Sequence, residues 1–340
     1  SEKEYVRAHD FRRYLHKNLE DFIIETPHKN PLELLNKKFD QSQIKTVQEK
    51  WKPYNFKDQN IDYFLQNLNI DKTVEISSIN GGYSNALKQL NKFIDNGYED
   101  YAKFSSNPSK EASSQLSPYF HSGQISTHEV FEKISNLESW TLESIDPKMV
   151  GRREGWWGST ENFESFMDEL ITWRELGYHT CVRRANYNQY SSLPEWAIKT
   201  LHEHSSDERE HIYSLDELTF SLTHDEIWNA AQNQLRTQGI IQNYLRMLWG
   251  KKILEWTPNP QIALSYMITL NDRFALDGRD PNSYSGVFWI LGRYDRAWGP
   301  ERSIYGKIRY MTSDSTSKKF NLKPYLEKWS NESLGIHTSL

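Results

Sequence analysis

A run of bulky apolar residues at helical spacing constrains the fold of this chain more than any other feature. Between residues 244 and 256 these residues recur at intervals of three, four and seven: Tyr244, Met247, Leu248, Trp249, Ile253, Leu254 and Trp256. Such spacing places their side chains on one stripe of a helix. The width of the stripe and the size of its rings predict a helix that is largely buried in a core.

Three tryptophans in this region are spaced so that they could form a chain of rings. Trp249 and Trp256 are seven residues apart, which puts them two helical turns, roughly 10 Å, apart on one face. Trp228 begins the preceding predicted helix, where His224 or Asp225 is a candidate cap. A helical hairpin would bring its indole near the other two and permit electron hopping. Large aromatics more commonly fill a core, and periodicity alone leaves both interpretations open.

The composition is that of an ordinary globular protein. The chain has 340 residues, 37% of them apolar and 14% aromatic, which is enough for a sizeable core in one large domain or two unequal ones. The formal net charge of −5 argues against non-specific coating of nucleic acid, which depends on many phosphate contacts. It does not exclude a local basic groove.

Several features predict an intracellular protein. The single cysteine, Cys181, excludes an internal disulfide and suits a reducing compartment. No run approaches the ~20 apolar residues of a membrane span, and no signal-peptide pattern opens the chain. We therefore expect cytoplasmic localisation in a prokaryote and nuclear localisation in a eukaryote.

The first 60 residues differ from the rest of the chain. The apolar residues between 2 and 24 predict one charged amphipathic helix: Tyr5, Phe11, Leu15, Leu19 and Phe22. Residues 25–60 have few apolar anchors and predict a long irregular linker, although such linkers are unusual inside a compact unit. We expect part of this linker to pack on the main domain.

Three further helices are predicted downstream. One lies within the segment 85–101 and ends at the stop signal Gly97. A second covers 164–178, and a third covers 193–204 with Pro194 in its first turn. The polar histidines beyond Pro194 lack the spacing of a metal site, so no metal is predicted: His202, His204 and His211.

Two loops carry residues that suit contacts with phosphates or nucleotides. The serine-rich loop before residue 117 could cradle phosphates, because free amides at a helix start attract anions; a solvated loop is the commoner case. The loop at 142–160 combines arginines with tryptophans, a mixture that grips unpaired nucleotides. The alternative, that its tryptophans close the edge of a core, is equally supported: Arg152, Arg153, Trp156 and Trp157.

Long motifs in a consistent order resemble the class II cyclobutane pyrimidine dimer photolyases, within the photolyase/cryptochrome family. The motifs are WNAAQ (228–232), YLRMLWGKKILEW (244–256), LND and LDGRDPN (270–282), GKIRYM (306–311), LSPYFHSGQIS (116–126) and DELITWREL (168–176). The similarity covers nearly the whole chain.

This resemblance implies an all-α fold class and a domain division. Residues 61–335 would form the helical FAD-binding domain, and residues 1–60 the helical and irregular interdomain connector. In the family an α/β antenna domain precedes the connector, so we expect a fragment or a short form that lacks this domain. The antenna chromophore is not predicted.

The resemblance also implies a set of FAD-binding residues. The loop that holds the FAD phosphates matches Tyr101, Ser113, Ser114, Leu116 and Ser117, and Arg174 matches a position that supports those phosphates. Arg246 and Asp277 match the ion pair beside the isoalloxazine ring, where a nearby charge tunes the redox state. Asn271, and also Asn282, would face flavin N5. Turn formation is an alternative role for Asn282 in DPNSY.

The family's electron path and lesion pocket map onto further residues. Trp249, Trp228 and Trp256 match, in that order from flavin to surface, the three tryptophans used for photoreduction. Glu169 and Trp173, which four residues place on one helix face, match residues that contact the thymine dimer. Met247 and Trp289 match other residues of the lesion pocket, with Trp289 opposing Trp173.

Some positions depart from the class II pattern. Ser105 and Ser106 replace an Arg-Asn pair, which removes a guanidinium that could reach the lesion or its phosphate. Gln234 occupies a position where glutamate is usual, and Gln242 occupies one where histidine is usual. Tyr294 replaces the histidine of an HDR motif. The predicted cofactor positions are intact, whereas the substrate positions are mixed.

The sequence thus predicts an enzyme, a carbon-carbon lyase that repairs pyrimidine dimers in UV-damaged DNA using blue light and FAD. A monomer is expected. The alternative is a cryptochrome-like photoreceptor, or another photolyase-derived flavoprotein, that binds FAD without repairing DNA; the substitutions at Ser105, Gln234, Gln242 and Tyr294 favour it. A non-catalytic DNA-binding helical domain would leave Arg246, Asn271 and Asp277 without a purpose.

Overall fold

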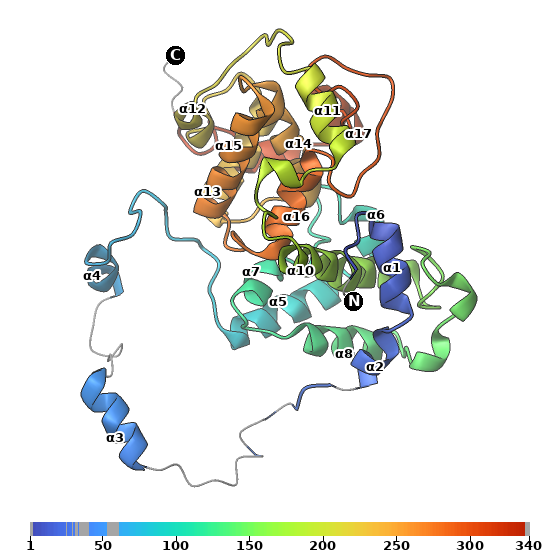
Figure 1. Cartoon of the computed structure of the whole chain (residues 1–340). Coiled ribbons are helices and arrows are strands. Elements are labelled where there is room, and N and C mark those ends of the chain that lie inside the picture. Colours follow the sequence, from blue (N-terminus) through green and yellow to red (C-terminus); the bar gives the residue numbers. More distant parts are fainter. Residues whose placement is uncertain are drawn as a thin grey trace.

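The computed structural model in Figure 1 describes the following residues: 3–24, 26–28, 30, 33, 41–52 and 61–336. These residues form helices and no strand, and β pairing among them is limited to isolated bridges such as that of Arg7 with Tyr294. The all-α fold class is therefore confirmed for the described part of the chain. No helix there is long and apolar enough to span a membrane.

The helices divide into two sets in chain order. The first set is α1 (Ala8–His16), α2 (Leu19–Ile24), α3 (Gln41–Lys50), α4 (Ile61–Gln66), α5 (Tyr83–Asn96), α6 (Tyr101–Phe104), α7 (Ser117–His121), α8 (Thr127–Leu137), η2 (Leu142–Ser144), η3 (Pro147–Met149), α9 (Glu161–Met167), η4 (Asp168–Trp173) and α10 (Arg174–Arg183). The second set is η5 (Tyr190–Ser192), α11 (Glu195–Glu203), α12 (Leu215–Thr219), α13 (Glu226–Gln238), α14 (Asn243–Glu255), α15 (Pro260–Phe274), α16 (Pro281–Ile290), α17 (Ser313–Lys319) and α18 (Lys323–Trp329).

Two clusters of buried side chains correspond to these sets. The N-terminal core contains side chains between Tyr5 and Leu176, and the C-terminal core contains side chains between Leu193 and Trp329. Figure 1 shows two lobes, one around α1, α5 and α8 and the other around α13, α14 and α15. Because α10 of the first set packs against α16 of the second, these two helices join the lobes.

The N-terminal segment forms two helices where the sequence predicts one. α1 ends at His16 and α2 starts at Leu19, and the side chain of Asn18 donates to the carbonyl of Tyr14 at the break. A side chain that bonds to the backbone in this way competes with the helical hydrogen bonds. The apolar face of α1 lies in the N-terminal core, so this helix packs on the body.

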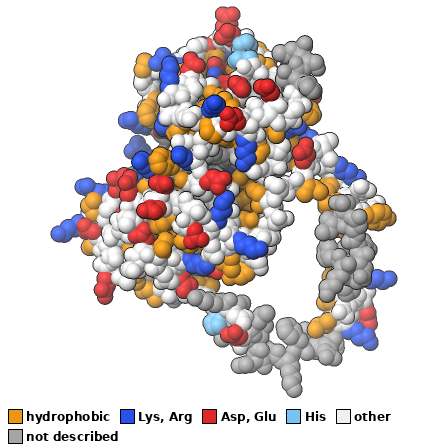
Figure 2. All heavy atoms as spheres, turned by 180° about the vertical axis from the view of Figure 1, so that it is seen from behind, with side chains coloured by type: hydrophobic (Ala, Val, Ile, Leu, Met, Phe, Trp, Pro, Cys, Tyr) orange, Lys and Arg blue, Asp and Glu red, His pale blue; other side chains and the backbone are white. Residues whose placement is uncertain are grey.

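The stretch 25–60, predicted to be an irregular linker, contains the helix α3. The prediction of an irregular structure is therefore wrong for residues 41–50. On α3 the side chains of Ile44 and Val47 are exposed. In Figure 1, α3 and α4 lie apart from the two lobes. Figure 2 shows the opposite face of the molecule, where acidic and basic side chains are interspersed over the body.

Capping residues define the helices that carry the predicted site. α13 starts at Asp225, one of the two candidate caps, and its carboxylate accepts from Trp228 N at 3.0 Å. α13 ends at Gly239, which has the left-handed φ of 73°. Gln242 then caps α14, with its Oε1 accepting from the amides of the first turn. The short connection turns α14 back along α13, and the two helices pack together.

The predicted helix at 164–178 is longer and less regular than expected. It continues from α9 through η4 into α10, and η4 is a π-helix. π-helical turns are rare and occur frequently at functional sites. Glu169 and Trp173 both belong to this π-helix.

Candidate functional site

Three buried tryptophans form a continuous file where α13 and α14 pack together. The rings of Trp228 and Trp249 are parallel within 3°, with centroids 6.5 Å apart. Trp256 meets Trp228 edge to face at 5.6 Å. Trp228 therefore lies between the other two, in the predicted order. Rings at these distances are in contact, so an electron could pass along the file without crossing other side chains.

Hydrogen bonds fix the inner two rings of the file. The indole nitrogen of Trp228 donates to the carbonyl of Trp249 at 3.0 Å. The indole nitrogen of Trp249 donates to Gln232 Oε1 at 2.8 Å, and Gln232 is completely buried. Among the described residues, Trp249 is the donor that satisfies this buried oxygen, so the orientation of its ring is fixed.

The outer end of the file approaches the surface. Trp256 contacts the ring of Tyr213 at 5.4 Å and the imidazole of His224 at 5.2 Å. The Tyr213 hydroxyl and His224 Nδ1 are hydrogen-bonded at 2.7 Å. Burial, and next the positive charge of His211, lower the pKa of His224. Tyr213 is partly exposed and His224 is exposed, which places Trp256 one residue layer below solvent.

The polar residues predicted beside the flavin ring form one cluster. Arg246 Nη1 lies 3.4 Å from Asn271 Oδ1, and Arg246 Nη2 lies 3.8 Å from Asp277 Oδ1. Asp277 Oδ1 is buried and accepts no hydrogen bond from the described residues. Arg246 and Trp249 lie less than one turn apart on α14, so the cluster adjoins the inner end of the tryptophan file.

Asn282 has a local role in the structure. Its backbone amide and its side-chain amide both donate to Asp280 Oδ1, at 2.9 and 3.0 Å. Asp280 is the N-cap of α16, so Asn282 helps to form the helix start, as the alternative interpretation of this residue predicts. The other carboxylate oxygen of Asp280 lies 3.3 Å from His121 Nδ1.

The predicted phosphate loop leads into α7 and lies beside a cavity. Ser117 begins α7, and Leu116 is fully buried below it. Gln89 fixes the loop by donating to the carbonyl of Ser114 at 2.9 Å, and Ser113 is partly exposed. A cavity of about 300 Å³ adjoins the loop, lined by Ser78, Ile79, Asn80, Asn85, Lys88, Gln89, Lys92, Gln115 and Tyr119.

The predicted lesion residues lie where the two lobes meet. Trp173 of the π-helix and Trp289 of α16 stack face to face, with ring centroids 4.4 Å apart. A base that entered between these two rings would have to part them. Met247 is partly buried against the C-terminal core. Arg174 follows Trp173, and its guanidinium lies 4.5 Å above the ring of Tyr178.

Glu169 has an unusual proton affinity for a carboxyl group. Dense protein surroundings, and next the negative charge of Asp168, raise the pKa of Glu169 to about 7, whereas the charges of Arg153 and Arg12 oppose this rise. The side chain is nevertheless accessible to solvent. Burial, and next the negative charges of Glu169 and Asp168, raise the pKa of Tyr101. This predicted FAD residue therefore lies near Glu169.

Comparison with known proteins decides the family. No protein-family model matches the chain. A deoxyribodipyrimidine photo-lyase from Methanothermobacter thermautotrophicus is 35% identical over 96% of this chain and 64% of its own length. Those from Potorous tridactylus and Arabidopsis thaliana are 38% and 40% identical over 77% and 69% of this chain, and over 46% and 44% of their own lengths. The chain belongs to the photolyase family. It spans about half to two thirds of the length of these curated relatives.

Solved structures of this family share the fold. A bacterial class III photolyase from Agrobacterium tumefaciens has a TM-score of 0.54 at 18% identity, covering 82% of this chain and 51% of the other. A cryptochrome from Synechocystis sp. PCC6803 has a TM-score of 0.53 at 15% identity, covering 85% and 57%. The family predicted from the sequence motifs is confirmed.

The positions that depart from the photolyase pattern have partners within this chain. Gln242 Nε2 donates to the carbonyl of Ser105 at 2.8 Å, so two of the substituted residues contact each other. Gln234 Oε1 accepts from the Tyr325 hydroxyl at 2.8 Å, and the Tyr294 hydroxyl lies 2.6 Å from Thr180 Oγ1.

The tryptophans of the loop at 142–160 belong to the core. Trp156 and Trp157 are each 2% exposed, and Trp156 stacks on His16 at 3.8 Å. Of the two interpretations left open, nucleotide gripping by these rings is therefore excluded. The arginines of the loop are exposed, and Arg153 acts on the pKa of Glu169.

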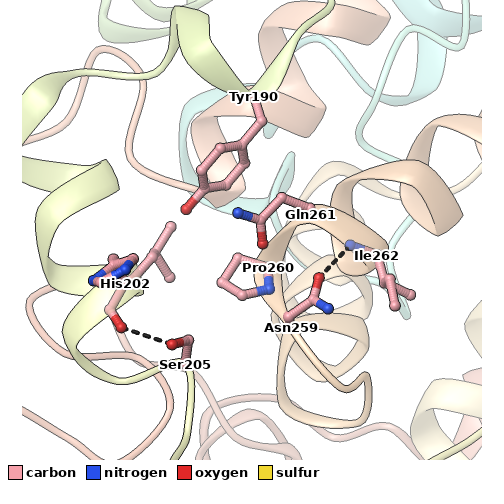
Figure 3. Close-up of a pocket in the computed structure, with 8 residues that line it drawn as sticks. Tyr190, His202, Ser205, Asn259, Pro260, Gln261 and Ile262 are labelled. Atoms are coloured by element: carbon pink, nitrogen blue, oxygen red, sulfur yellow. Dashed lines mark hydrogen bonds between the residues drawn. The ribbon is translucent and has the colours of Figure 1, made fainter.

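A larger cavity, of about 460 Å³, lies away from the predicted site. Figure 3 shows its lining, in which Ser205 bonds to the carbonyl of His202 and Asn259 caps α15: Tyr190, Leu201, His202, Ser205, Asn259, Pro260, Gln261 and Ile262. None of these is a predicted photolyase residue. The described residues contain no group of three or more His, Cys, Asp or Glu side chains that could hold a metal ion.

Three residues that touch the predicted site were missed from the sequence. Gln232 lies four residues after Trp228, so helical spacing of a polar residue beside the tryptophans could have indicated it. Arg12 and Asp168 form an ion pair over 156 residues of sequence. No pattern in the sequence indicates such a distant pair.

Proposed function

We propose that this chain carries the light-dependent, FAD-dependent repair of cyclobutane pyrimidine dimers in DNA, in the manner of a class II photolyase. The observation that carries the proposal is the file Trp249, Trp228 and Trp256, which runs from the polar cluster of Arg246 toward the surface. A core alone needs neither parallel indoles nor a polar cluster at one end.

The residues present fit FAD. Asp277 Oδ1 is a buried acceptor without a hydrogen-bond donor among the described residues, and Arg246 is too far from it for a hydrogen bond. Such unsatisfied acceptors are uncommon in proteins, and a ligand with polar ring atoms can satisfy them. Arg246, Asn271 and Asp277 would bind the flavin ring, while Tyr101, Ser113, Ser114, Leu116, Ser117 and Arg174 would hold the phosphates.

The chain's own residues would position the lesion. When bound, reduced FAD would supply the light-excited electron that opens the cyclobutane ring and that the products return. Trp173, Trp289 and Met247 would stack against the flipped dimer, and base stacking on an aromatic ring contributes about 1–3 kcal/mol per base. Glu169, whose pKa is about 7, would be protonated in much of the protein at neutral pH and could donate a hydrogen bond to the dimer.

Repair of a defined substrate tests the proposal. A thymine-dimer oligonucleotide is mixed with chemically reduced, FAD-loaded protein, and recovery of base absorbance in the ultraviolet is followed under blue light and in the dark. We expect recovery in the light only. No recovery from protein that demonstrably holds reduced FAD would contradict repair.

A second candidate is a photoreceptor that retains FAD and the tryptophan file without repairing DNA. The contact between Ser105 and Gln242 supports it, because both residues depart from the repair pattern and hydrogen-bond to each other. Direct stacking of Trp173 on Trp289 also supports it. Light-driven reduction of FAD without dimer repair is the result that this candidate predicts.

A further inference from the structure

The carboxylate of Asp168 is held between an arginine and a tryptophan. Arg12 of α1 donates through Nε and Nη2 to the two oxygens of Asp168, at 2.8 and 2.9 Å. The indole nitrogen of Trp173 donates to Asp168 Oδ2 at 3.1 Å. Both charged side chains are buried, with 8% and 6% of their surfaces exposed. A two-point arginine–carboxylate bond fixes direction as well as distance.

The π-helix makes this contact possible. Asp168 and Trp173 are five residues apart, and in an α-helix this interval turns through about 500°, which leaves the two side chains on different faces. A π-helix closes its hydrogen bonds between residues five apart and so brings such residues onto one face. The irregular segment Asp168–Trp173 is therefore what aims the indole at the carboxylate.

We propose that Arg12 and Asp168 are positioning residues for the indole of Trp173, so that α1 is part of the substrate site. This proposal rests on the proposed function, because Trp173 is a lesion contact only in a photolyase-type site. Asp168 orients the ring by accepting its N–H, and Arg12 fixes the carboxylate that accepts. The stack of Trp173 on Trp289 then presents one ordered aromatic surface.

Docking of α1 alone does not require this ion pair. Phe11 and Leu15 already bury the apolar face of α1 in the N-terminal core. His16 stacks on Trp156, and its Nδ1 accepts from Gly151 N at 3.1 Å. Replacing a buried ion pair by apolar residues is often neutral or stabilising. Arg12 and Asp168 thus have a role beyond attachment of the helix, and the shared indole supplies it.

Asp168 and Arg12 shift the pKa of Glu169 in opposite directions. The charge of Asp168 raises the pKa of Glu169 and that of Arg12 lowers it. Loss of Asp168 would therefore lower this pKa, and loss of Arg12 would raise it. Both changes would release the indole of Trp173. Asp168→Asn removes one of these charges and Arg12→Lys keeps the other, so an effect on the indole that both variants share cannot come from the Glu169 pKa.

The test uses Asp168→Asn, which has nearly the same volume, and Arg12→Lys, which keeps the charge but not the two-point fork. Asp71→Asn is the matched control, because Asp71 pairs with Arg273 Nε at 2.8 Å in another part of the protein. Each full-length variant is labelled with 5-fluorotryptophan, and the Trp173 fluorine resonance is identified by its loss in Trp173→Phe. FAD content is measured by absorbance.

We expect the Trp173 resonance to shift and broaden in Asp168→Asn and Arg12→Lys and to stay unchanged in Asp71→Asn. Preference for a dimer-containing duplex over an undamaged one should fall about tenfold in the first two variants, a factor worth 1.4 kcal/mol and within the range for stacking of a base. FAD content should not change.

An unchanged Trp173 resonance in both variants would overturn the proposal, and so would a resonance change of equal size in Asp71→Asn. A different result would contradict the proposed function. If the wild-type protein shows no dimer preference and no repair, the photolyase function is lost, while the fluorine resonance still reports whether Arg12 and Asp168 position the indole.

Discussion

At the scale of single residues, Trp228 is the connecting ring of the tryptophan file. It contacts both other rings and is completely buried. We predict that Trp228→Phe abolishes light-driven reduction of bound FAD, because a smaller ring with a higher oxidation potential interrupts the path. FAD binding should be retained. The measurement is the rate of FAD reduction under blue light with an external reductant.

Trp140→Phe is the matched control for that change. Trp140 is also buried, and its indole nitrogen donates to the carbonyl of Trp157 at 2.7 Å, just as that of Trp228 donates to the carbonyl of Trp249. Both substitutions remove an indole donor from a tryptophan carbonyl, so they should cost similar stability. Equal loss of photoreduction in both variants would remove the file from the electron path.

The raised pKa of Glu169 leads us to expect that the stability of the folded protein depends on pH. The pKa is raised from 4.5 to about 7 in the folded protein, so folding favours the protonated form. This contribution is complete below pH 4.5 and is lost as the pH rises through 7. We predict that Glu169→Gln raises the melting temperature at pH 8 by about 1–2 °C, after allowance for solvent screening of an exposed group, and has little effect at pH 5.

Thermal unfolding of FAD-free protein at the two pH values measures this difference. Arg153→Gln gives a second check on the sign, because removal of this guanidinium should raise the pKa of Glu169 further. The stabilising effect of Glu169→Gln at pH 8 would then be larger in the Arg153→Gln background, because the effect grows with pH from the unfolded pKa up to the folded pKa. A Glu169→Gln effect that is larger at pH 5 than at pH 8 would contradict the assignment.

The grouping of residues in space was predictable where a motif supplied it and not where only packing did. The tryptophans and the Arg246 cluster stand in long motifs, and the structure brings each set together. Asp168 also stands in a motif, but its link to Trp173 depends on a π-turn that helical periodicity does not predict. The roles themselves stay predictions until they are measured.

At the scale of elements, the turn between α13 and α14 depends on Gly239. A Cβ atom there would lie 2.5 Å from Leu276 Cγ, and the residue has a left-handed φ of 73°. Leu276 N donates to the carbonyl of Gly239 at 2.8 Å, and Leu276 directly precedes Asp277. We predict that Gly239→Ala destabilises the fold by about 2–4 kcal/mol, from backbone strain plus overpacking, and weakens FAD binding.

Gly123→Ala separates the two causes. Gly123 also has a left-handed φ, of 64°, but no atom would lie within 4 Å of an added Cβ. This variant should lose only the strain energy, about 1–2 kcal/mol, and should bind FAD normally. Urea unfolding and FAD titration of both variants provide the comparison. If the two variants lose equal stability, the contact with Leu276 has no energetic role.

Helix positions followed from periodicity and caps, whereas irregular segments did not. The cap at Asp225 and the stop at Gly97 were predicted correctly, because these residues act through their own backbone neighbourhood. The break before Leu19 contains neither proline nor glycine, and its one local signal is Asn18, a residue whose side chain can compete with the helical hydrogen bonds. α3 has little apolar content, and its sequence offered no stripe from which to predict a helix.

At the scale of the whole molecule, the predicted FAD ligands are divided between two cores. Tyr101, Leu116 and Arg174 lie on or between helices of the N-terminal core. Arg246 and Asn271 lie on helices of the C-terminal core. The sequence predicts one helical domain over 61–335, whereas the buried side chains form two cores that divide the chain between Leu176 and Leu193. The helical stripes predict that side chains are buried but not which helices pack together. A ligand that contacts both sets would tie the two cores together.

This arrangement predicts how FAD changes unfolding. Without FAD the two cores should unfold in two overlapping calorimetric transitions, and with FAD they should merge into one at higher temperature, because a ligand that binds only the folded form stabilises whatever it contacts. FMN carries the isoalloxazine ring alone and ADP the phosphates and adenine alone, so each should raise at most one transition. A single transition without FAD, or full merging with FMN, would show that FAD is not the connection between the cores.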